Sequence, residues 1–124
     1  MEKADYSWRP YFIATQPRAL SSDESEIVVQ LLDLNGEQFR DQLPGLVVVG
    51  RCGCAMCPTV FFQPYTSGSN ELDVSQLIGR DFRDELVCAV LIQDDGVLSQ
   101  LEFYSLDGHQ SFGLPISNLL EYSQ

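Results

Sequence analysis

Basic residues are scarce in this sequence. Seven Lys and Arg stand against 18 Asp and Glu, which gives a formal net charge of −11. The seven are also scattered and form no run: Lys3, Arg9, Arg18, Arg40, Arg51, Arg80 and Arg83. Binding to nucleic-acid phosphates or anionic lipid requires clustered Lys and Arg. We therefore expect no nucleic-acid partner and no membrane contact, whereas an acidic surface of this kind can attract a basic protein.

Long apolar runs are absent as well. No window approaches the roughly 18 apolar residues of a membrane span. The N-terminal sequence, M-E-K-A-D-Y-S-W-R-P, lacks the apolar segment of a signal peptide. Both absences predict a cytoplasmic protein. Thiols stay reduced there, so the four cysteines are expected to be free thiols or metal ligands and not disulfides.

Complete catalytic motifs are missing too. A Ser-His-Asp or Cys-His device would have to use the single histidine, His109. It follows Asp107-Gly108, and this sequence is typical of a polar turn. Neither glycine-rich phosphate-binding motif occurs. We therefore assign no catalytic residue and favour a protein that is not an enzyme.

What the chain does contain is enough apolar material for one core. A domain of 124 residues buries roughly two thirds of the surface that its unfolded chain exposes. No internal repeat or change of composition marks a boundary, so residues 1–124 are predicted to form one domain.

A helix is predicted from Ser21, because Ser21 and Glu24 fit a capping box. Its apolar stripe should face the core and comprises Ile27, Val28, Leu31 and Leu32. Asn35-Gly36 should end the helix, with Gly36 in the left-handed conformation. A second short helical piece is expected over 37–43.

Two hairpins are predicted. Apolar runs at 46–49 and 59–62 read as antiparallel strands joined by a thiol-bearing turn at 52–58. The runs 86–92 and 97–106 flank Asp94-Asp95-Gly96, and Asp-Gly is the signature of a tight turn at 94–97. On the last strand Val97, Leu101 and Phe103 should share one face and Gln100 and Glu102 the other.

Weaker patterns complete the expected fold. A short edge strand is predicted at 11–13, a short strand or strap around Leu72 and Val74, a return strand at 111–114 and a C-terminal helical turn over 115–122. The sum is an α+β fold, with an N-terminal helix packed on a mainly antiparallel sheet of four to six strands.

The cysteines carry the sharpest chemical pattern. Cys52, Cys54 and Cys57 lie close together at a turn, and zinc needs four ligands in a tetrahedron. With Cys88 as the fourth ligand they form a candidate metal site. Two alternatives stay open: thiols buried as small apolar groups, and redox chemistry at the C-x-x-C spacing of Cys54 and Cys57.

Two stretches resemble a group of short acidic bacterial proteins. The first is V-V-V-G-R-C-G-C at 47–54 followed by C-P-T-V at 57–60, and the second is D-G-V-L-S-Q-L-E-F-Y-S at 95–105. The group has V-V-G-R-C-x-C-G-C-P-[T/S]-V before D-G-x-L-S-x-L-E-x-Y-S. This chain has Ala55-Met56 where the group has one glycine. The resemblance covers about a quarter of the chain and implies a bacterial origin and one compact domain, but no reaction.

Small size, acidity and the lack of a catalytic set favour a non-enzymatic binding or inhibitor protein. An immunity-type protein that blocks a basic toxin is one concrete form. The alternative is a small metal-binding module with zinc at the four cysteines, followed by a thiol redox protein. The sequence does not indicate the oligomeric state.

Overall fold

The computed structural model describes residues 12–54, 56–65, 70–109, 111–116 and 121–122. The elements in chain order are β1 (Phe12–Ala19), α1 (Ser22–Asn35), the 3-10 helix η2 (Glu37–Gly45), β2 (Val47–Cys52), β3 (Val60–Phe61), β4 (Glu71–Arg80), β5 (Leu86–Asp94), β6 (Val97–Ser105) and β7 (Glu121–Tyr122). No helix among the described residues is long and apolar enough to cross a membrane.

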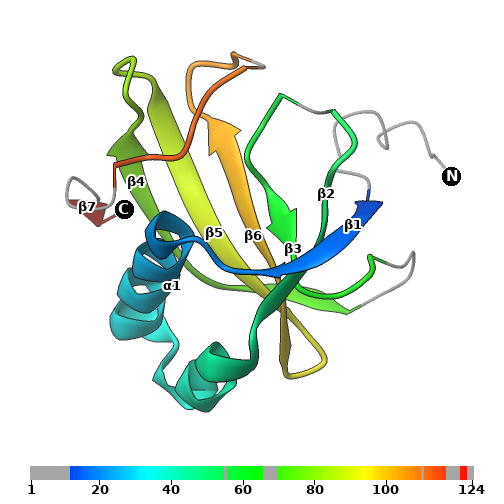
Figure 1. Cartoon of the computed structure of the whole chain (residues 1–124). Helices are drawn as coiled ribbons and strands as arrows, with labels where there is room; N and C mark the ends of the chain where they lie inside the picture. The colour runs from blue at the N-terminus through cyan, green and yellow to red at the C-terminus, as the bar shows by residue number, and fades with distance from the viewer. Residues whose placement is uncertain (1–11, 55, 66–69, 110, 117–120, 123–124) are drawn as a thin grey trace, which may run out of the picture.

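One antiparallel sheet contains every strand of the described part of the chain. Its seven strands follow the order β1-β2-β3-β6-β5-β4-β7, and β3 and β7 have two residues each. Helix α1 contacts β4 and β5 (Figure 1). The α+β prediction, the helix on the sheet and both hairpins are thereby confirmed. Figure 1 also shows the β2–β3 turn, the β4–β5 turn and the segment after β6 at one end of the sheet.

Helix α1 begins as predicted. The Ser21 hydroxyl accepts from the Glu24 amide at 3.1 Å, and Glu24 Oε1 accepts from the Ser21 amide at 2.9 Å. The helix ends at Gly36, but φ there is −165°, so the left-handed cap was a wrong prediction. Glycine is required for a different reason, because a Cβ at Gly36 would lie 2.9 Å from Val74 on β4.

The main core lies between α1 and the sheet. The predicted helix stripe, Ile27, Val28, Leu31 and Leu32, is fully buried. It packs with apolar side chains of β5 and β6, among them Leu91, Leu98, Leu101 and Phe103. Each such side chain stabilises the fold by roughly 1.5–3 kcal/mol relative to an exposed position.

A bulge on β6 changes the expected faces of that strand. The pairing with β5 shifts between Ile92 and Gln93, which leaves Ser99 as the extra residue. Leu98 therefore occupies the core position expected for Val97, and Val97 is 48% exposed. Leu101 and Phe103 do share the core face, as predicted.

Strand β4 is longer than the sequence indicated. Its pairing with β5 shifts between Asp73 and Ser75, and both Val74 and Ser75 are buried. This bulge breaks the apolar alternation that identifies a strand. The Ser75 hydroxyl donates to the carbonyl of Leu31 at 2.6 Å and ties β4 to α1.

Two C-terminal predictions were wrong where the structure describes them. Residues 111–114 form no strand, because the Gly113 amide donates to the Asp81 carboxylate and the Phe112 amide to the Met56 carbonyl. Glu121–Tyr122 is strand β7, paired with β4, and not part of a helical turn. Residues 117–120 and Tyr11 of the expected edge strand lie outside the described residues, whereas β1 from Phe12 is an edge strand.

Candidate functional site

The three clustered cysteines lie at the tip of the β2–β3 hairpin. Gly50 pairs with Phe61 and Arg51 with Val60, so the turn begins at Cys52, the last residue of β2. Both arms are anchored in the interior, with Val48 at 2% and Phe61 at 1% exposure. The turn therefore projects from a rigid base.

The sulfur atoms converge. Ligating atoms of Cys52, Cys54 and Cys57 all lie within 4.8 Å of one another, and the Cys54 and Cys57 Sγ atoms are 3.4 Å apart. In a regular zinc tetrahedron with Zn–S bonds of about 2.3 Å, neighbouring sulfurs are about 3.8 Å apart. The described geometry thus needs only small adjustments to bind such an ion.

Backbone amides within the turn donate to the sulfurs. The Cys54 amide lies 3.5 Å from Cys52 Sγ, and the Met56 amide lies 3.4 Å from Cys54 Sγ. Amide donors favour the charged form of an acceptor. In known reactive cysteine sites, a helix N-terminus supplies amide donors of this kind.

The thiols differ in acidity. Burial raises the pKa of Cys52 to about 12. Burial also opposes ionisation of Cys54, but hydrogen bonds from the Met56 amide and the two neighbouring thiols outweigh it and lower the Cys54 pKa. Cys52 is buried, Cys57 is half-buried and Cys54 is exposed. Cys54, whose pKa is lowered, is thus the thiol that faces solvent.

Thr59 connects this turn to the core. It is 1% exposed, and its hydroxyl accepts from the Phe103 amide at 3.0 Å. The same oxygen lies 3.5 Å from Cys57 Sγ. Because Phe103 belongs to β6, the position of Cys57 is set by a strand in the centre of the sheet.

Cys88 lies elsewhere. It is in the middle of β5, 1% exposed, in a buried cluster with Val90 and Ile92, and its sulfur is 3.7 Å from Gln76 Oε1. The structure therefore brings together three of the four predicted ligands. Among the described residues the thiol group has no fourth protein ligand.

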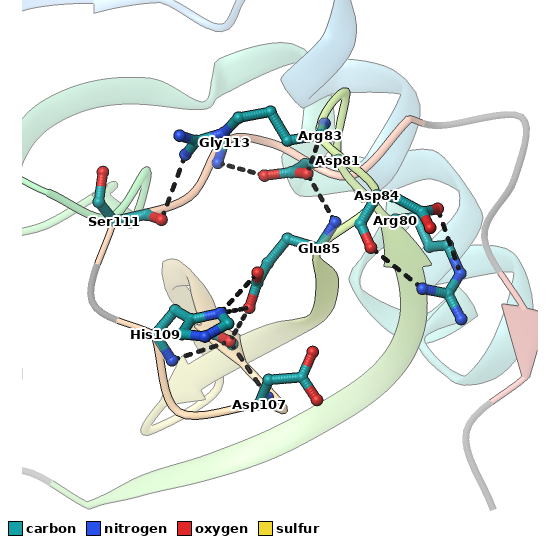
Figure 2. Close-up of polar contacts among 10 residues, drawn as sticks. Arg80, Asp81, Arg83, Asp84, Glu85, Asp107, His109, Ser111 and Gly113 are labelled. Carbon is teal, nitrogen blue, oxygen red and sulfur yellow. Dashed lines mark hydrogen bonds and ion pairs between the residues drawn. The ribbon is translucent and has the colours of Figure 1, made fainter.

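His109 forms a second polar cluster, which Figure 2 shows. Its Nδ1 lies 2.7 Å from both carboxylate oxygens of Glu85. The Ser105 hydroxyl donates to Glu85 and accepts from the amides of Asp107 and His109. Ligating atoms of Glu85, Asp107 and His109 lie within 4.8 Å of one another. These contacts hold the turn after β6 against the start of β5.

That cluster lacks the geometry of a catalytic triad. The serine hydroxyl bonds the carboxylate and not the imidazole, whereas a triad places the histidine between them. Hydrogen bonds from Ser105 and His109 lower the pKa of Glu85. Within the described part of the chain, no cysteine is a hydrogen-bond partner of His109.

Sequence reasoning missed Asp81, the buried centre of the β4–β5 turn (Figure 2). It is 2% exposed and accepts from the amides of Arg83, Glu85 and Gly113, each at 2.9 Å. Burial alone would raise its pKa, but the three amides lower it. The sequence around Asp81 shows no motif that predicts this role. One of the three donors, the Gly113 amide, comes from a segment far away in the sequence.

The acidic pair Asp94-Asp95 has a structural role, as predicted. Asp95 and Gly96 have φ values of 58° and 88°, which a tight hairpin turn requires. Asp94 accepts from the Asn70 amide at 3.0 Å. The turn is also held by Gln42, which donates to the Gly96 carbonyl at 3.0 Å.

No family model matches this chain, and no curated protein or solved structure matches it either. Function is therefore inferred from the chain's own residues.

Proposed function

We propose that the tip of the β2–β3 hairpin binds a soft metal ion, zinc first among them, through Cys52, Cys54 and Cys57. One observation carries the proposal: their three sulfur atoms lie within 4.8 Å of one another. Thiolates select soft or borderline ions such as Zn²⁺ and Cu⁺. Magnesium and calcium, which take oxygen ligands, do not fit this site.

Three protein ligands leave one position of a zinc tetrahedron open. Such a position holds water or an external ligand, as in zinc sites that act on or bind other molecules. Cys54 is exposed and Met56 is 49% exposed, which supports access of such a ligand from solvent. Binding would release protons from the thiols, because the metal takes the thiolate form.

Metal uptake by the reduced protein tests this proposal. Protein purified without a tag is loaded with Zn²⁺ or Co²⁺, and bound metal is measured by elemental analysis. We expect about one equivalent in the native chain and in Cys88→Ala, and a large loss in Cys54→Ala and Cys57→Ala. Cys88→Ala is the matched control because Cys88 is a buried cysteine outside the cluster. Less than about 0.1 equivalent in the native chain is incompatible with the proposal.

Thiol redox chemistry is the competing use of the same turn. A disulfide between Cys54 and Cys57 requires their sulfurs to approach from 3.4 Å to about 2.05 Å. The loading experiment separates the two uses. A redox pair would give a protein that loses two hydrogens on mild oxidation and binds no metal when reduced.

A second candidate function is binding of a basic protein, with an immunity-type inhibitor in the cytoplasm as one form. The net charge of −11 supports it, because such a charge attracts a basic partner over a distance. Pull-down from the host at low and moderate salt tests it. Recovery of a basic partner, weakened by salt, is expected. Recovery of none at either salt would contradict it.

A further inference from the structure

The thiol group at the β2–β3 turn consists of three sulfur atoms, and the described residues add no fourth protein ligand. Zinc fills the remaining corner of its tetrahedron with water or an external ligand. Trivalent arsenic and antimony are also soft and prefer thiolates. They need no further ligand, because a lone electron pair occupies their fourth corner. Three thiols are therefore a complete ligand set for a trivalent metalloid.

The separation of two of these sulfurs fits such an atom. The Cys54 and Cys57 Sγ atoms lie 3.4 Å apart, which is closer than the about 3.8 Å of a zinc tetrahedron. A lone pair repels the bonds beside it, so the bond angles at a trivalent metalloid are narrower than tetrahedral. Because As–S bonds resemble Zn–S bonds in length, the narrower angles bring the sulfurs closer together. The Cys52 sulfur lies within 4.8 Å of the other two, so one atom at the apex of a pyramid can reach all three.

Burial and charge favour a neutral complex at this turn. Cys52 is 5% exposed, and burying an anion costs more free energy than burying a neutral group. Three thiolates around Zn²⁺ leave a net negative charge at the site, whereas three around trivalent arsenic leave none. The incoming species fits as well, because arsenous acid, As(OH)₃, is uncharged near neutral pH. The net charge of −11 therefore does not repel it.

The thiols differ in exposure in a way that suits stepwise binding. Cys54 is exposed, so the first bond to an incoming metalloid can form there. The other two sulfurs lie within 4.8 Å, so the second and third bonds form at high effective concentration. The buried Thr59 hydroxyl lies 3.5 Å from Cys57 Sγ and limits the movement of that thiol.

We propose that Cys52, Cys54 and Cys57 bind trivalent arsenic or antimony as a pyramidal complex with three sulfur ligands. The observation that carries the proposal is the convergence of three thiols, two of them 3.4 Å apart, without a fourth ligand from the described residues. The inference rests on the proposed function, because the same three sulfurs bind the ion. It adds trivalent metalloids to the ligands of that site.

The binding reaction is an exchange of ligands on the metalloid. Each thiol replaces one hydroxide of the trihydroxide, so three metalloid–oxygen bonds break and three metalloid–sulfur bonds form. Each thiol proton joins the hydroxide that leaves, and three water molecules are released. The metalloid stays trivalent and the sulfurs are not oxidised, so no oxidant or reductant takes part.

Native mass spectrometry of the reduced full chain, purified without a tag, tests the site. Arsenite and antimony(III) tartrate are the probes, in separate arms. We expect the chain to gain one metalloid atom and lose three hydrogens, and X-ray absorption at the arsenic edge to show three sulfurs and no oxygen. Uptake of both probes supports the whole class, and uptake of arsenite alone supports the smaller atom. Arsenate, which is pentavalent, should give no adduct.

Single substitutions make the result specific. Cys52→Ala, Cys54→Ala and Cys57→Ala each remove one sulfur and should weaken arsenite binding by at least about tenfold, because a multidentate complex loses one attachment. Cys88→Ala is the matched control, since Cys88 is a buried cysteine outside the cluster, and it should bind as the native chain does. Cys52 is buried, so its variant is checked for folding by circular dichroism. The sulfur count in the native chain tests the same residue without a substitution.

Several results would overturn the inference. No adduct at about 1 mM arsenite, where even a site with a Kd of about 0.1 mM would be largely filled, excludes it. Two sulfurs and one oxygen around arsenic, with Cys52→Ala binding like the native chain, would show a site of two thiols only. Zinc uptake is measured on separate samples without arsenite. Uptake of zinc but not arsenite removes this inference alone, uptake of arsenite but not zinc removes the zinc assignment alone, and uptake of neither removes both.

Discussion

The four cysteines of this protein occupy different environments. Cys52 is buried with its pKa raised to about 12, Cys54 is exposed with its pKa lowered, and Cys57 lies against Thr59. Cys88 is buried among aliphatic side chains, and burial raises its pKa. At the scale of single residues, the acidity of each of these thiols therefore depends on its burial and on its neighbours.

Glu102 gives a pH-dependent prediction. Its pKa in the folded state, about 7, lies above the ordinary value of 4.5, so folding favours the protonated form. The stability it contributes is fully present below about pH 4.5 and is lost as the pH rises to about 7. By about pH 8 the loss should reach up to about 3 kcal/mol. Urea unfolding of the native chain and Glu102→Gln from about pH 4 to 8 measures it.

Glu102→Gln should be more stable than the native chain at about pH 8. Its free energy of unfolding should not show the decrease with pH that the Glu102 carboxyl causes. Asp41→Asn, an exposed change of the same kind, should follow the native curve. Identical curves for the native chain and Glu102→Gln would show that Glu102 titrates normally.

Asp81 should be the position of the β4–β5 turn at which substitution destabilises the fold most. Asp81→Ala leaves three amides without their acceptor, and we expect a loss of about 2–4 kcal/mol in the free energy of unfolding. Asp84→Asn is the control, because its carboxylate is exposed and its ion pair with Arg80 is 3.7 Å long. A loss of less than about 0.5 kcal/mol for Asp81→Ala would contradict this role.

At the scale of elements, local signals specify some parts of the fold and pairing specifies others. The capping box at Ser21 and the turn at Asp95-Gly96 are short-range signals, and both were predicted correctly from sequence. The full length of β4 and the place of Val97 on β6 were not, because bulges near Val74 and at Ser99 shift the alternation. A bulge depends on the partner strand, so one sequence segment does not reveal it.

The packing of β1 on β2 gives an element-scale prediction. Phe12 lies over Gly50 and meets the Phe61 ring edge to face at 5.4 Å between centroids. A Cβ at Gly50 would lie 2.2 Å from the Phe12 ring, so Gly50→Ala must displace that ring or β1. We expect a loss of about 1–3 kcal/mol in the free energy of unfolding.

Gly45→Ala is the matched control, because no atom lies within 4 Å of its added Cβ. Thermal unfolding of both variants measures the difference. Equal midpoints would mean that the β1 contact is not part of the stable fold.

At the scale of the whole molecule, the sheet holds the cysteine turn without depending on a metal. Both arms of the hairpin are buried, and the core between α1 and the sheet, against which Cys57 packs, is built of apolar side chains. We therefore expect a chelator to leave the far-UV spectrum unchanged while lowering the unfolding midpoint. At a free metal concentration of 100 times Kd the linked stabilisation is about 2.7 kcal/mol. Complete unfolding on chelation would contradict this independence.

The sequence predicted the sulfur-bearing hairpin but not the composition of its site. Spacing alone placed Cys52, Cys54 and Cys57 together, and the structure agrees. Cys88 was assigned to the same site only because a fourth ligand was needed, and the β5 register places it elsewhere.

The ligand set of the metal-loaded protein tests the central claim most directly. X-ray absorption of the zinc form counts the sulfur atoms around the ion. The account predicts three sulfurs at about 2.3 Å and one nitrogen or oxygen, unchanged in Cys88→Ala. Four sulfurs, one of them lost in Cys88→Ala, or a shell with no sulfur would contradict it.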